Sequence, residues 1–197
     1  MNDILIYGAG GHARVVAEIA ELCGVTDISF YQHEGDKTHI FGYPLINNPS
    51  EFERCVIAIG NNYTRKKIAL ELNKRFVTLI HPSNSISTRA IISDGCVLMA
   101  GVVINSGAIV GKHCILNTNA SVDHECKLED FVHLSPNVAL AGNVNVGEGT
   151  HVGIGACIIQ GVTVGKWCTI GAGAVVIRDV PDGSTVVGNP AKLLNKK

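Results

Sequence analysis

The sequence predicts a small α/β domain followed by a parallel β-helix, a fold in which the chain coils around a triangular prism. Two observations carry this prediction. Residues 1–83 alternate between strand-like and helix-like patterns, and residues 84–180 repeat an apolar residue at every sixth position. The 197 residues are 46% hydrophobic, which is enough for a core in each part. Aromatic residues make up only 5%, whereas there are 22 Gly, a balance that suits short strands and tight turns.

The segment 1–83 predicts a Rossmann-like unit. Short apolar runs mark its strands, and apolar residues at helical spacing mark its helices. The expected elements are, in order, a strand with a glycine-rich turn at 4–12, a helix at 13–24, strands at 28–31 and 55–60, a helix at 64–76 and a strand at 77–82. This order implies a small parallel sheet with helices on its faces. It has about half the length of a full dinucleotide-binding fold.

The second part is dominated by its repeat. Every sixth residue from Ile86 to Val176 is Ile, Leu or Val, without exception over sixteen positions. The residues two places earlier form a second column of small or β-branched side chains, such as Ala108 and Ala120. One large and one small inward residue in each repeat predict a prism in which three repeats, one for each face, make one coil. Neighbouring coils are expected to lie ~4.8 Å apart, the usual strand spacing.

The seven cysteines lack the paired spacing of a disulfide framework or a structural zinc site. Four of them fall in the column of small inward residues, where a compact apolar side chain is needed. We interpret these four as packing residues: Cys96, Cys114, Cys126 and Cys168. The other three, Cys23, Cys55 and Cys157, receive no role from the sequence.

The charge pattern points away from nucleic acids and membranes. The formal net charge is −1, and no apolar run approaches the ~18–20 residues of a membrane-spanning helix. Arg65, Lys66 and Lys67 are interpreted as a solvated helix face, with a phosphate clamp as the alternative. The N-terminus enters a strand-like run without a basic leader. We therefore expect a cytoplasmic protein with no nucleic-acid or membrane partner.

Three titratable residues, Asp123, His124 and Glu125, stand side by side within the repeat. His124 lies two positions after an inward Val, so its side chain is expected outside the prism. A carboxylate beside an imidazole fixes its tautomer and raises the basicity of the other ring nitrogen. One coil further on stands Gly142, where a ligand could approach the backbone and the N–H could stabilise an oxyanion. We interpret His124 as a general base; the alternative is a solvated surface histidine.

His133 and His151 are separated by three repeats, which is one full coil, and are therefore expected to stack on another face of the prism. Outward imidazoles on more than one face favour contacts between the faces of neighbouring subunits. A prism with three equivalent faces readily forms a cyclic trimer. The sequence thus predicts a homotrimer whose active-site clefts are shared between subunits.

The segment GAGGH at 8–12 predicts an anion site. A glycine-rich turn between a strand and a helix points backbone N–H groups at an anion, typically a phosphate. The GxGxxG pattern is incomplete, so a tight turn without a ligand is the alternative. The third strand also ends in a polar turn, and α/β sheets bind ligands beyond the carboxyl ends of their strands. The candidate residues of this edge are Gly10, Gly11, His12, Gly60 and Asn61.

Across essentially the whole chain, the sequence resembles the bacterial nucleotide-aminosugar N-acetyltransferases with a left-handed β-helix and their sialic acid O-acetyltransferase relatives. The segments that carry the resemblance are GAGGH (8–12), IAIGNN (57–62), IHPSN (80–84), ILNT (115–118), VDHEC (122–126), ALAGNV (139–144) and VVGNPAK (186–192). The resemblance implies a left-handed coil, which the repeat alone does not reveal. It also implies a nucleotide-sugar domain at 1–83, an acyltransferase domain at 84–180 and a tail on the coenzyme A side at 181–197.

The resemblance further implies a reaction and a role for each site residue. The expected reaction is acetylation of the 4-amino group of a nucleotide-linked sugar, foremost UDP-2-acetamido-4-amino-2,4,6-trideoxyglucose of bacillosamine synthesis. His124 would be the general base, polarised by Glu125. The implied ligand contacts are Asn117 to the sugar, His133 to the acetyl thioester, Gly142 to the acetyl carbonyl, Ile154, Ala172 and Gly173 to coenzyme A, and Gly10, Gly11 and His12 to the nucleotide diphosphate.

One segment departs from the family pattern. After the second strand the family often carries two acidic residues that contact the nucleotide, whereas this chain has Gln32 and His33. Either Glu34 or Asp36 takes over that contact, or the nucleotide is not UDP, or the contact is dispensable. The identity of the nucleotide therefore stays open.

The expected mechanism is direct transfer from acetyl-CoA, a co-substrate, without a metal. No acyl-enzyme is expected, because the repeat pairs no Ser or Cys with a His. The nearest alternative is O-acetylation of a sugar hydroxyl, as on sialic acid. A zinc lyase of the γ-carbonic anhydrase type would resemble a site with two His about five positions apart, and the β-helix has no such outward pair. A catalytically silent nucleotide-binding scaffold is the third alternative.

Overall fold

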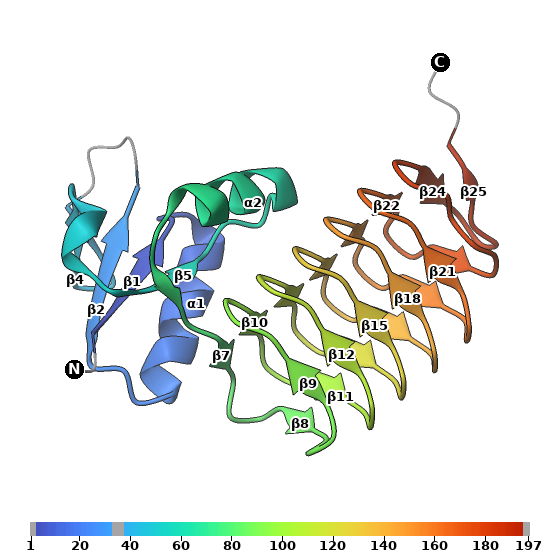
Figure 1. Cartoon of the computed structure of the whole chain (residues 1–197), viewed down its shortest axis with the longest axis horizontal. Helices are drawn as coiled ribbons and strands as arrows, with labels where there is room; N and C mark the ends of the chain where they lie inside the picture. Colours follow the sequence, from blue (N-terminus) through green and yellow to red (C-terminus); the bar gives the residue numbers. More distant parts are fainter. Residues whose placement is uncertain (1–2, 33–37, 195–197) are drawn as a thin grey trace.

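The computed structural model describes residues 3–32 and 38–194. Figure 1 shows an α/β domain beside a long prism of stacked coils, with the two helices of the domain next to the first coils. Within the described residues, no helix is both long and apolar enough to span a membrane.

The α/β domain contains a six-stranded sheet in the order β3-β4-β2-β1-β5-β6, parallel except for the β3–β4 pair. Its side chains alternate along β1: Ile4 and Ile6 pack with the residues of α1, whereas Leu5 packs on the opposite side, near α2. Helices therefore cover both faces, as predicted. The elements are β1 (Asp3–Tyr7), α1 (Gly11–Leu22), β2 (Asp27–Tyr31), β3 (His39–Ile40), β4 (Tyr43–Ile46), the 3-10 helix η1 (Pro49–Glu51), β5 (Arg54–Ile57), α2 (Asn62–Glu71) and β6 (Arg75–Phe76).

The second helix has other ends than predicted. The helix expected at 64–76 begins at Asn62, because the Asn61 side chain accepts a hydrogen bond from the Thr64 N–H at 2.9 Å and caps the helix. It ends at Glu71, and Arg75–Phe76 forms strand β6 beside β5 instead. The short strands β3 and β4 were not predicted, because their mixed polar and apolar residues give no strand period.

The strand expected at 77–82 belongs to the prism and not to the α/β sheet. Strand β7 (Leu79–Ile80) pairs with β10 (Val97–Leu98), which places it one coil below that strand on the first face. Ile80 stands one repeat before Ile86, so it obeys the period of the prism. The α/β sheet ends at Phe76, and the coils begin at Leu79 rather than after residue 83.

The prism is a left-handed parallel β-helix made of very short strands. The first face holds β7, β10, β13 (Ile115–Leu116), β16 (His133–Leu134), β19 (His151–Val152), β22 (Thr169–Ile170), β24 (Thr185–Val187) and β25 (Lys192–Leu193). The second face holds β8 (Ser85–Ile86), β11 (Val103–Ile104), β14 (Ser121–Val122), β17 (Ala139–Leu140), β20 (Cys157–Ile158) and β23 (Val175–Val176). The third face holds β9 (Ile91–Ile92), β12 (Ile109–Val110), β15 (Lys127–Leu128), β18 (Asn145–Val146) and β21 (Thr163–Val164).

The interior of the prism follows the predicted columns. From Leu98 to Val176 every sixth residue is buried, whereas Ile86 and Ile92 are half-buried at the open end. Residues one coil apart are register partners, for example Ser121 and Ala139. Cys96, Cys114, Cys126 and Cys168 are buried and free in the small column, as predicted. Of the others, Cys55 is buried, and Cys23 and Cys157 are exposed.

The α/β domain is joined to the prism through α2 and Arg65. The side chain of Arg65 is 1% exposed. Its Nε donates to the His113 carbonyl at 2.8 Å, and its Nη2 donates to the Phe131 carbonyl at 2.9 Å. These two carbonyls belong to successive turns of the prism. Its Nη1 donates to the carbonyls of Ile59 and Gly60 at 2.9 and 3.2 Å. One buried guanidinium therefore fixes the end of β5 against two coils.

The turns that receive α2 carry bulky residues in an unusual backbone conformation. His113, Phe131 and Trp167 have φ values of 55°, 61° and 54°, in the left-handed region that costs bulky residues about 1–2 kcal/mol each. Their rings offset that cost by packing. The Trp167 ring lies 4.1 Å from that of Tyr63 in α2, and the His113 and Phe131 rings are stacked at 5.1 Å.

Candidate functional site

His124 lies on the turn from the second face to the third, directly after β14. Its backbone N–H donates to the Asp123 carboxylate at 2.7 Å, and that carboxylate also accepts a hydrogen bond from the Asn105 amide at 2.8 Å. These bonds, with the Asn105 bond first, lower the pKa of Asp123, so the carboxylate stays charged at neutral pH. Asp123 thus fixes the backbone of the turn rather than the imidazole.

Glu125 is the carboxylate that reaches the imidazole. Its Oε2 lies 3.4 Å from the Nδ1 of His124, and both side chains are exposed. In the neutral imidazole, an Nδ1–H that donates to this carboxylate leaves the lone pair on Nε2. The structure therefore brings the two predicted catalytic residues together.

Gly142 lies directly against the His124 ring. A Cβ at residue 142 would be 2.5 Å from Cε1 and 2.6 Å from Nε2 of that ring, so only Gly leaves room for it. The flanking N–H groups of Ala141 and Asn143 donate to the Ile158 and His124 carbonyls. Within residues 3–32 and 38–194, no acceptor takes the Gly142 N–H. A backbone N–H without an internal acceptor is the kind of donor that an oxyanion site requires.

Replacing Gly142 with alanine is expected to lower kcat by about 10², because the new methyl group displaces the imidazole by roughly an ångström. Steady-state rates at saturating substrates would measure the effect. Gly147→Ala is the matched control, since its Cβ would meet the backbone of Gly165 at 2.6 Å, far from His124. We expect this control to lose stability but to keep kcat. Equal losses of kcat in both variants would mean that general strain in the coils, not the ring position, is responsible.

A second group of histidines lies where the first face of the prism meets the α/β domain. The His133 Nδ1–H donates to the Gly60 carbonyl at 3.3 Å, which fixes the lone pair on Nε2. The His133 and His151 rings stack at 4.9 Å, as their separation by one coil predicted. Ser135 Oγ lies 2.9 Å from His151 Nε2 and holds that ring in place.

These histidines are neutral. Burial lowers the pKa of His133 to about 3, with further contributions from His151 and Arg65. Burial and then Arg65 lower the pKa of His12 to about 4. The Nε2 atoms of both rings are buried without a partner among the described residues. Because a buried polar atom without a hydrogen bond costs free energy, a polar ligand group or a water is expected there. The His133 Nε2 offers an acceptor, so it fits a hydroxyl or N–H of a ligand.

The remaining nucleotide-sugar candidates lie at element ends. Gly10 caps α1 and Gly11 begins it, with open space where a side chain would be. Asn61 caps α2 beside Gly60, next to His133. Asn117 stands on the turn from the first face to the second, where its Oδ1 accepts from the Thr118 N–H at 2.8 Å. Gly10, Gly11, Gly60 and Asn61 thus follow the carboxyl ends of β1 and β5, as predicted.

The coenzyme A candidates Ile154, Ala172 and Gly173 lie on the turns from the first face to the second, in the upper coils. All three are exposed, and the Gly173 N–H donates to the Ile154 carbonyl at 2.8 Å. They therefore form one continuous outer edge. His124 and Gly142 lie on a different edge, and His133 lies on the first face. One chain thus presents the predicted site residues on separate sides of the prism.

Arg65 is the residue that the sequence interpretation placed wrongly. It was expected on a solvated helix face with Lys66 and Lys67, but it is buried in the junction, whereas Lys66 pairs with Glu148 and Lys67 is exposed. The buried residues of α2 are Asn62, Arg65 and Ile68, which are spaced by three. Residues at this spacing share one side of a helix, and the spacing could therefore have identified Arg65 as a buried residue.

The segment after β2 was expected to contact the nucleotide. Gln32 is half-buried directly after β2. His33, Glu34 and Asp36 lie outside the described residues. Among residues 3–32 and 38–194, no group of three or more His, Cys, Asp or Glu side chains could hold a metal ion.

Acid is expected to weaken the junction between the two domains. His12, His113 and His133 all lie there, and burial lowers the pKa of each from the ordinary 6.5, to about 4, about 4 and about 3. Because the unfolded chain then binds more protons than the folded one, stability is complete above pH 6.5 and is lost as the pH falls towards 4 and 3. Thermal melts between pH 7 and 4 would measure the loss. His113→Phe, which cannot be protonated, should melt with less dependence on pH.

Comparisons with known proteins agree with this architecture. Residues 3–72 match the family model described as the PglD N-terminal domain. The chain is 41% identical over 115 residues to UDP-N-acetylbacillosamine N-acetyltransferase of Bacillus subtilis (strain 168). That match covers 51% of this chain and 52% of the relative, so it spans about half of the curated protein's length.

Two solved structures match over almost the whole chain. The acetyltransferase domain of PglB from Neisseria gonorrhoeae FA1090 in complex with acetyl coenzyme A is 41% identical, with a TM-score of 0.92 over 98% of this chain and 99% of that one. A histidine-to-alanine variant of GDP-perosamine N-acetyl transferase from Caulobacter crescentus, in complex with CoA and GDP-perosamine, is 36% identical. Its TM-score is 0.95 over 98% of this chain and 97% of that one.

Proposed function

Because the chain belongs to the family of β-helical acetyltransferases with a PglD N-terminal domain, we propose that it transfers the acetyl group of acetyl-CoA to the amino group of a nucleotide-linked sugar. Three relatives support the proposal by what they bind or do: one acts on UDP-N-acetylbacillosamine, one is a complex with acetyl coenzyme A, and one is a complex with CoA and GDP-perosamine. The first and the third differ in their nucleotide, which is UDP in one and GDP in the other.

The observation that carries the proposal is the contact of His124 with Glu125 and Gly142. The His124 Nε2 removes a proton from the sugar amine while the amine nitrogen attacks the thioester carbonyl carbon. The carbonyl oxygen becomes an oxyanion, which the Gly142 N–H stabilises. As the intermediate collapses, the carbon–sulfur bond breaks, and the coenzyme A thiolate leaves and takes up a proton. Holding both substrates side by side supplies much of the remaining acceleration.

The finer assignment is the 4-amino group of UDP-2-acetamido-4-amino-2,4,6-trideoxyglucose. It is supported by the Bacillus subtilis relative and by the Gly10, Gly11 and His12 edge, where a diphosphate can meet the start of α1. In this assignment Gly60 and Asn61 line the same edge, and Asn117 contacts the sugar. His133 accepts a hydrogen bond from the acetyl donor or the sugar.

The separation of these residues supports a trimer with shared sites. His124 stands on one edge of the prism, whereas Ile154, Ala172 and Gly173 form another, so an edge of a second subunit completes the site. The outward residues of the second face are small or apolar in every strand: Ser85, Val103, Ser121, Ala139, Cys157 and Val175. Such a face can approach a neighbour closely. Activity that persists unchanged after dilution has dissociated the trimer would contradict shared sites.

A panel of acceptors would test the proposal. UDP-, dTDP- and GDP-linked 4-amino sugars would be incubated with acetyl-CoA, and thiol release would be measured. We expect the UDP-linked amine to react fastest. Sialic acid as acceptor covers the hydroxyl alternative, since thiol release with it alone would establish an O-acetyltransferase. If no acceptor releases thiol and acetyl-CoA does not bind, the protein is a nucleotide-binding scaffold and the proposal fails.

A further inference from the structure

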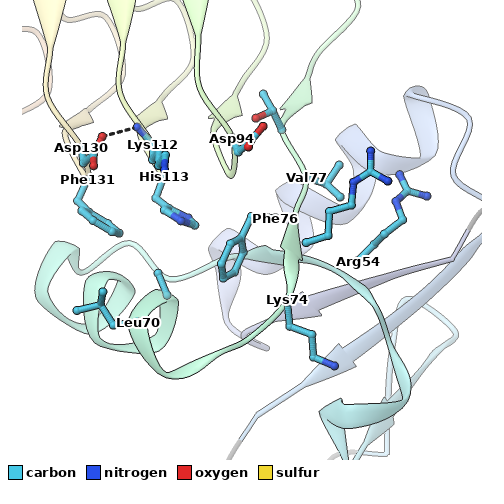
Figure 2. A pocket seen from close by; sticks show the side chains of 13 residues that line it. Arg54, Leu70, Lys74, Phe76, Val77, Asp94, Lys112, His113, Asp130 and Phe131 are labelled. Carbon is cyan, nitrogen blue, oxygen red and sulfur yellow. Dashed lines mark hydrogen bonds between the residues drawn. The ribbon is translucent and has the colours of Figure 1, made fainter.

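A cavity of about 870 Å³ lies apart from the predicted catalytic residues, at the opposite end of the α/β sheet. Its walls are the last turn of α2, strand β6 and three successive turns of the prism, which contribute Asp94, Lys112 and Asp130. Figure 2 shows these prism residues on one side and Phe76, Val77 and Arg54 on the other. Arg54 begins β5, whereas Gly60 follows its carboxyl end, so the sheet separates this cavity from the predicted nucleotide-sugar edge. Its volume is in the range of small-molecule sites.

Aromatic and apolar side chains form one wall. The Phe76 ring meets the edge of the His113 ring at 4.5 Å and 81°, and His113 is stacked on Phe131. Gly95 leaves room for the His113 ring, since a Cβ there would collide with Nδ1. Leu70 completes the wall and is 76% exposed, although it is a large apolar residue. A flat ring can stack here.

Cationic residues also line the cavity. Arg54 and Arg75 are register partners on neighbouring parallel strands, so their cationic side chains lie on the same face of the sheet. Lys112 adds a third cation from the prism. Among the described residues, no carboxylate pairs with the side chain of Arg75 or Lys112. Lys74 does not contribute, because its amine donates to the Ser50 and Phe52 carbonyls and points away in Figure 2.

Two carboxylates complete the lining. Asp130 Oδ1 accepts the Lys112 N–H at 2.7 Å, and Asp94 stands on the preceding coil. The cavity thus offers a flat apolar wall, guanidinium groups that suit phosphate oxygens, and acceptors for amino or hydroxyl groups. A nucleoside phosphate has all three complementary parts. A bare phosphate would leave the aromatic wall unused, and an apolar molecule would leave the cationic side unused.

We propose that this cavity is a second binding site, for a nucleoside phosphate, and that it is separate from the site of acetyl transfer. The base packs against Phe76 and Leu70, and the phosphate groups meet Arg75 and Lys112. The proposal goes beyond the proposed acetyltransferase function and does not depend on which sugar is acetylated.

Calorimetric titration of the full chain with ADP would test the second site. The variant Arg75→Gln with Lys112→Gln is expected to bind one ADP fewer per chain than the wild type, or to bind it at least tenfold more weakly. The control, Lys67→Gln with Arg178→Gln, removes two exposed cations outside the cavity and should bind like the wild type. Equal binding by all three proteins would overturn the proposal.

Two further measurements test the contact with the base and the independence of this site from acetyl transfer. Inorganic pyrophosphate should bind at least tenfold more weakly than ADP, and Phe76→Leu should remove most of that difference, because it deletes the ring but keeps an apolar residue. Pyrophosphate binding as tight as that of ADP would overturn the assignment to a nucleoside. Thiol release should be unchanged in the Arg75→Gln, Lys112→Gln protein. A protein without acetyltransferase activity that still shows the ADP difference would contradict the proposed function but not the second site.

Discussion

Replacing His124 with alanine is expected to lower kcat by about 10²–10⁴, the usual contribution of a general base. The loss should appear in kcat rather than in binding, because the Nε2 lone pair is used when the amine attacks the thioester. At high pH the rate of the variant should recover partly, since the amine then loses its proton without help. Stopped thiol-release assays from pH 6 to 10 would measure both effects.

The matched control is His39→Ala. His39 is an exposed histidine on β3, and its Nδ1 lies 3.2 Å from the hydroxyl of its neighbour Thr38. It should keep the wild-type rate at every pH. If purified His124→Ala folds normally and turns over like the wild type, His124 is not the base. Asn105→Ala adds a graded case, because it removes one of the two hydrogen bonds that hold the Asp123 carboxylate and should reduce kcat less than His124→Ala.

Arg65→Ala is expected to produce the largest loss of stability, about 3–5 kcal/mol, because it leaves several buried acceptors unpaired. The substitution removes the guanidinium from the carbonyls of His113 and Phe131, together with those of Ile59 and Gly60. Each buried acceptor left without a partner costs about 1–3 kcal/mol, although such costs are not additive. Arg65→Lys should restore little, since an ammonium cannot reach acceptors on two turns and on the end of β5 together.

Urea unfolding followed by circular dichroism would measure this loss. We expect the α/β domain to unfold first, since Arg65 joins it to the coils. Lys67→Ala is the control, because Lys67 lies on the same helix but its side chain is 76% exposed. An Arg65→Ala protein as stable as the control would show that the carbonyls find other donors.

The sequence predicted the prism well because its repeat is redundant. Each coil requires one large and one small or β-branched inward residue, so a single polar member of the column such as Thr150 does not hide the period. The stacking of Gly142 on His124 and of His151 on His133 followed from the same three-repeat spacing. The residues of each pair are neighbours in adjacent coils, although they are distant in the chain.

Contacts between the two domains could not be predicted in this way. Nothing in the period reveals that Arg65 donates to the carbonyls of His113 and Phe131, or that His12 and His133 are buried in one junction. Strand β7 was assigned to the wrong sheet for a related reason, because VTLIHP reads as a strand in either context. Which sheet such a strand joins depends on how side chains of the two domains pack together. The repeat in the sequence does not reveal that packing.

Helix α2 contacts four successive turns of one prism edge, at His113, Phe131, Gly149 and Trp167. Each of these residues stands one coil above the one before it, so the helix fits the prism only when these four turns keep their regular spacing. A coil inserted between any two of them would move the upper contacts by ~4.8 Å and detach the helix. Coils added beyond Trp167 would leave it undisturbed. Lengthening by whole coils is therefore compatible with this domain only at the C-terminal end, which limits where insertions and deletions can be tolerated during the divergence of such chains.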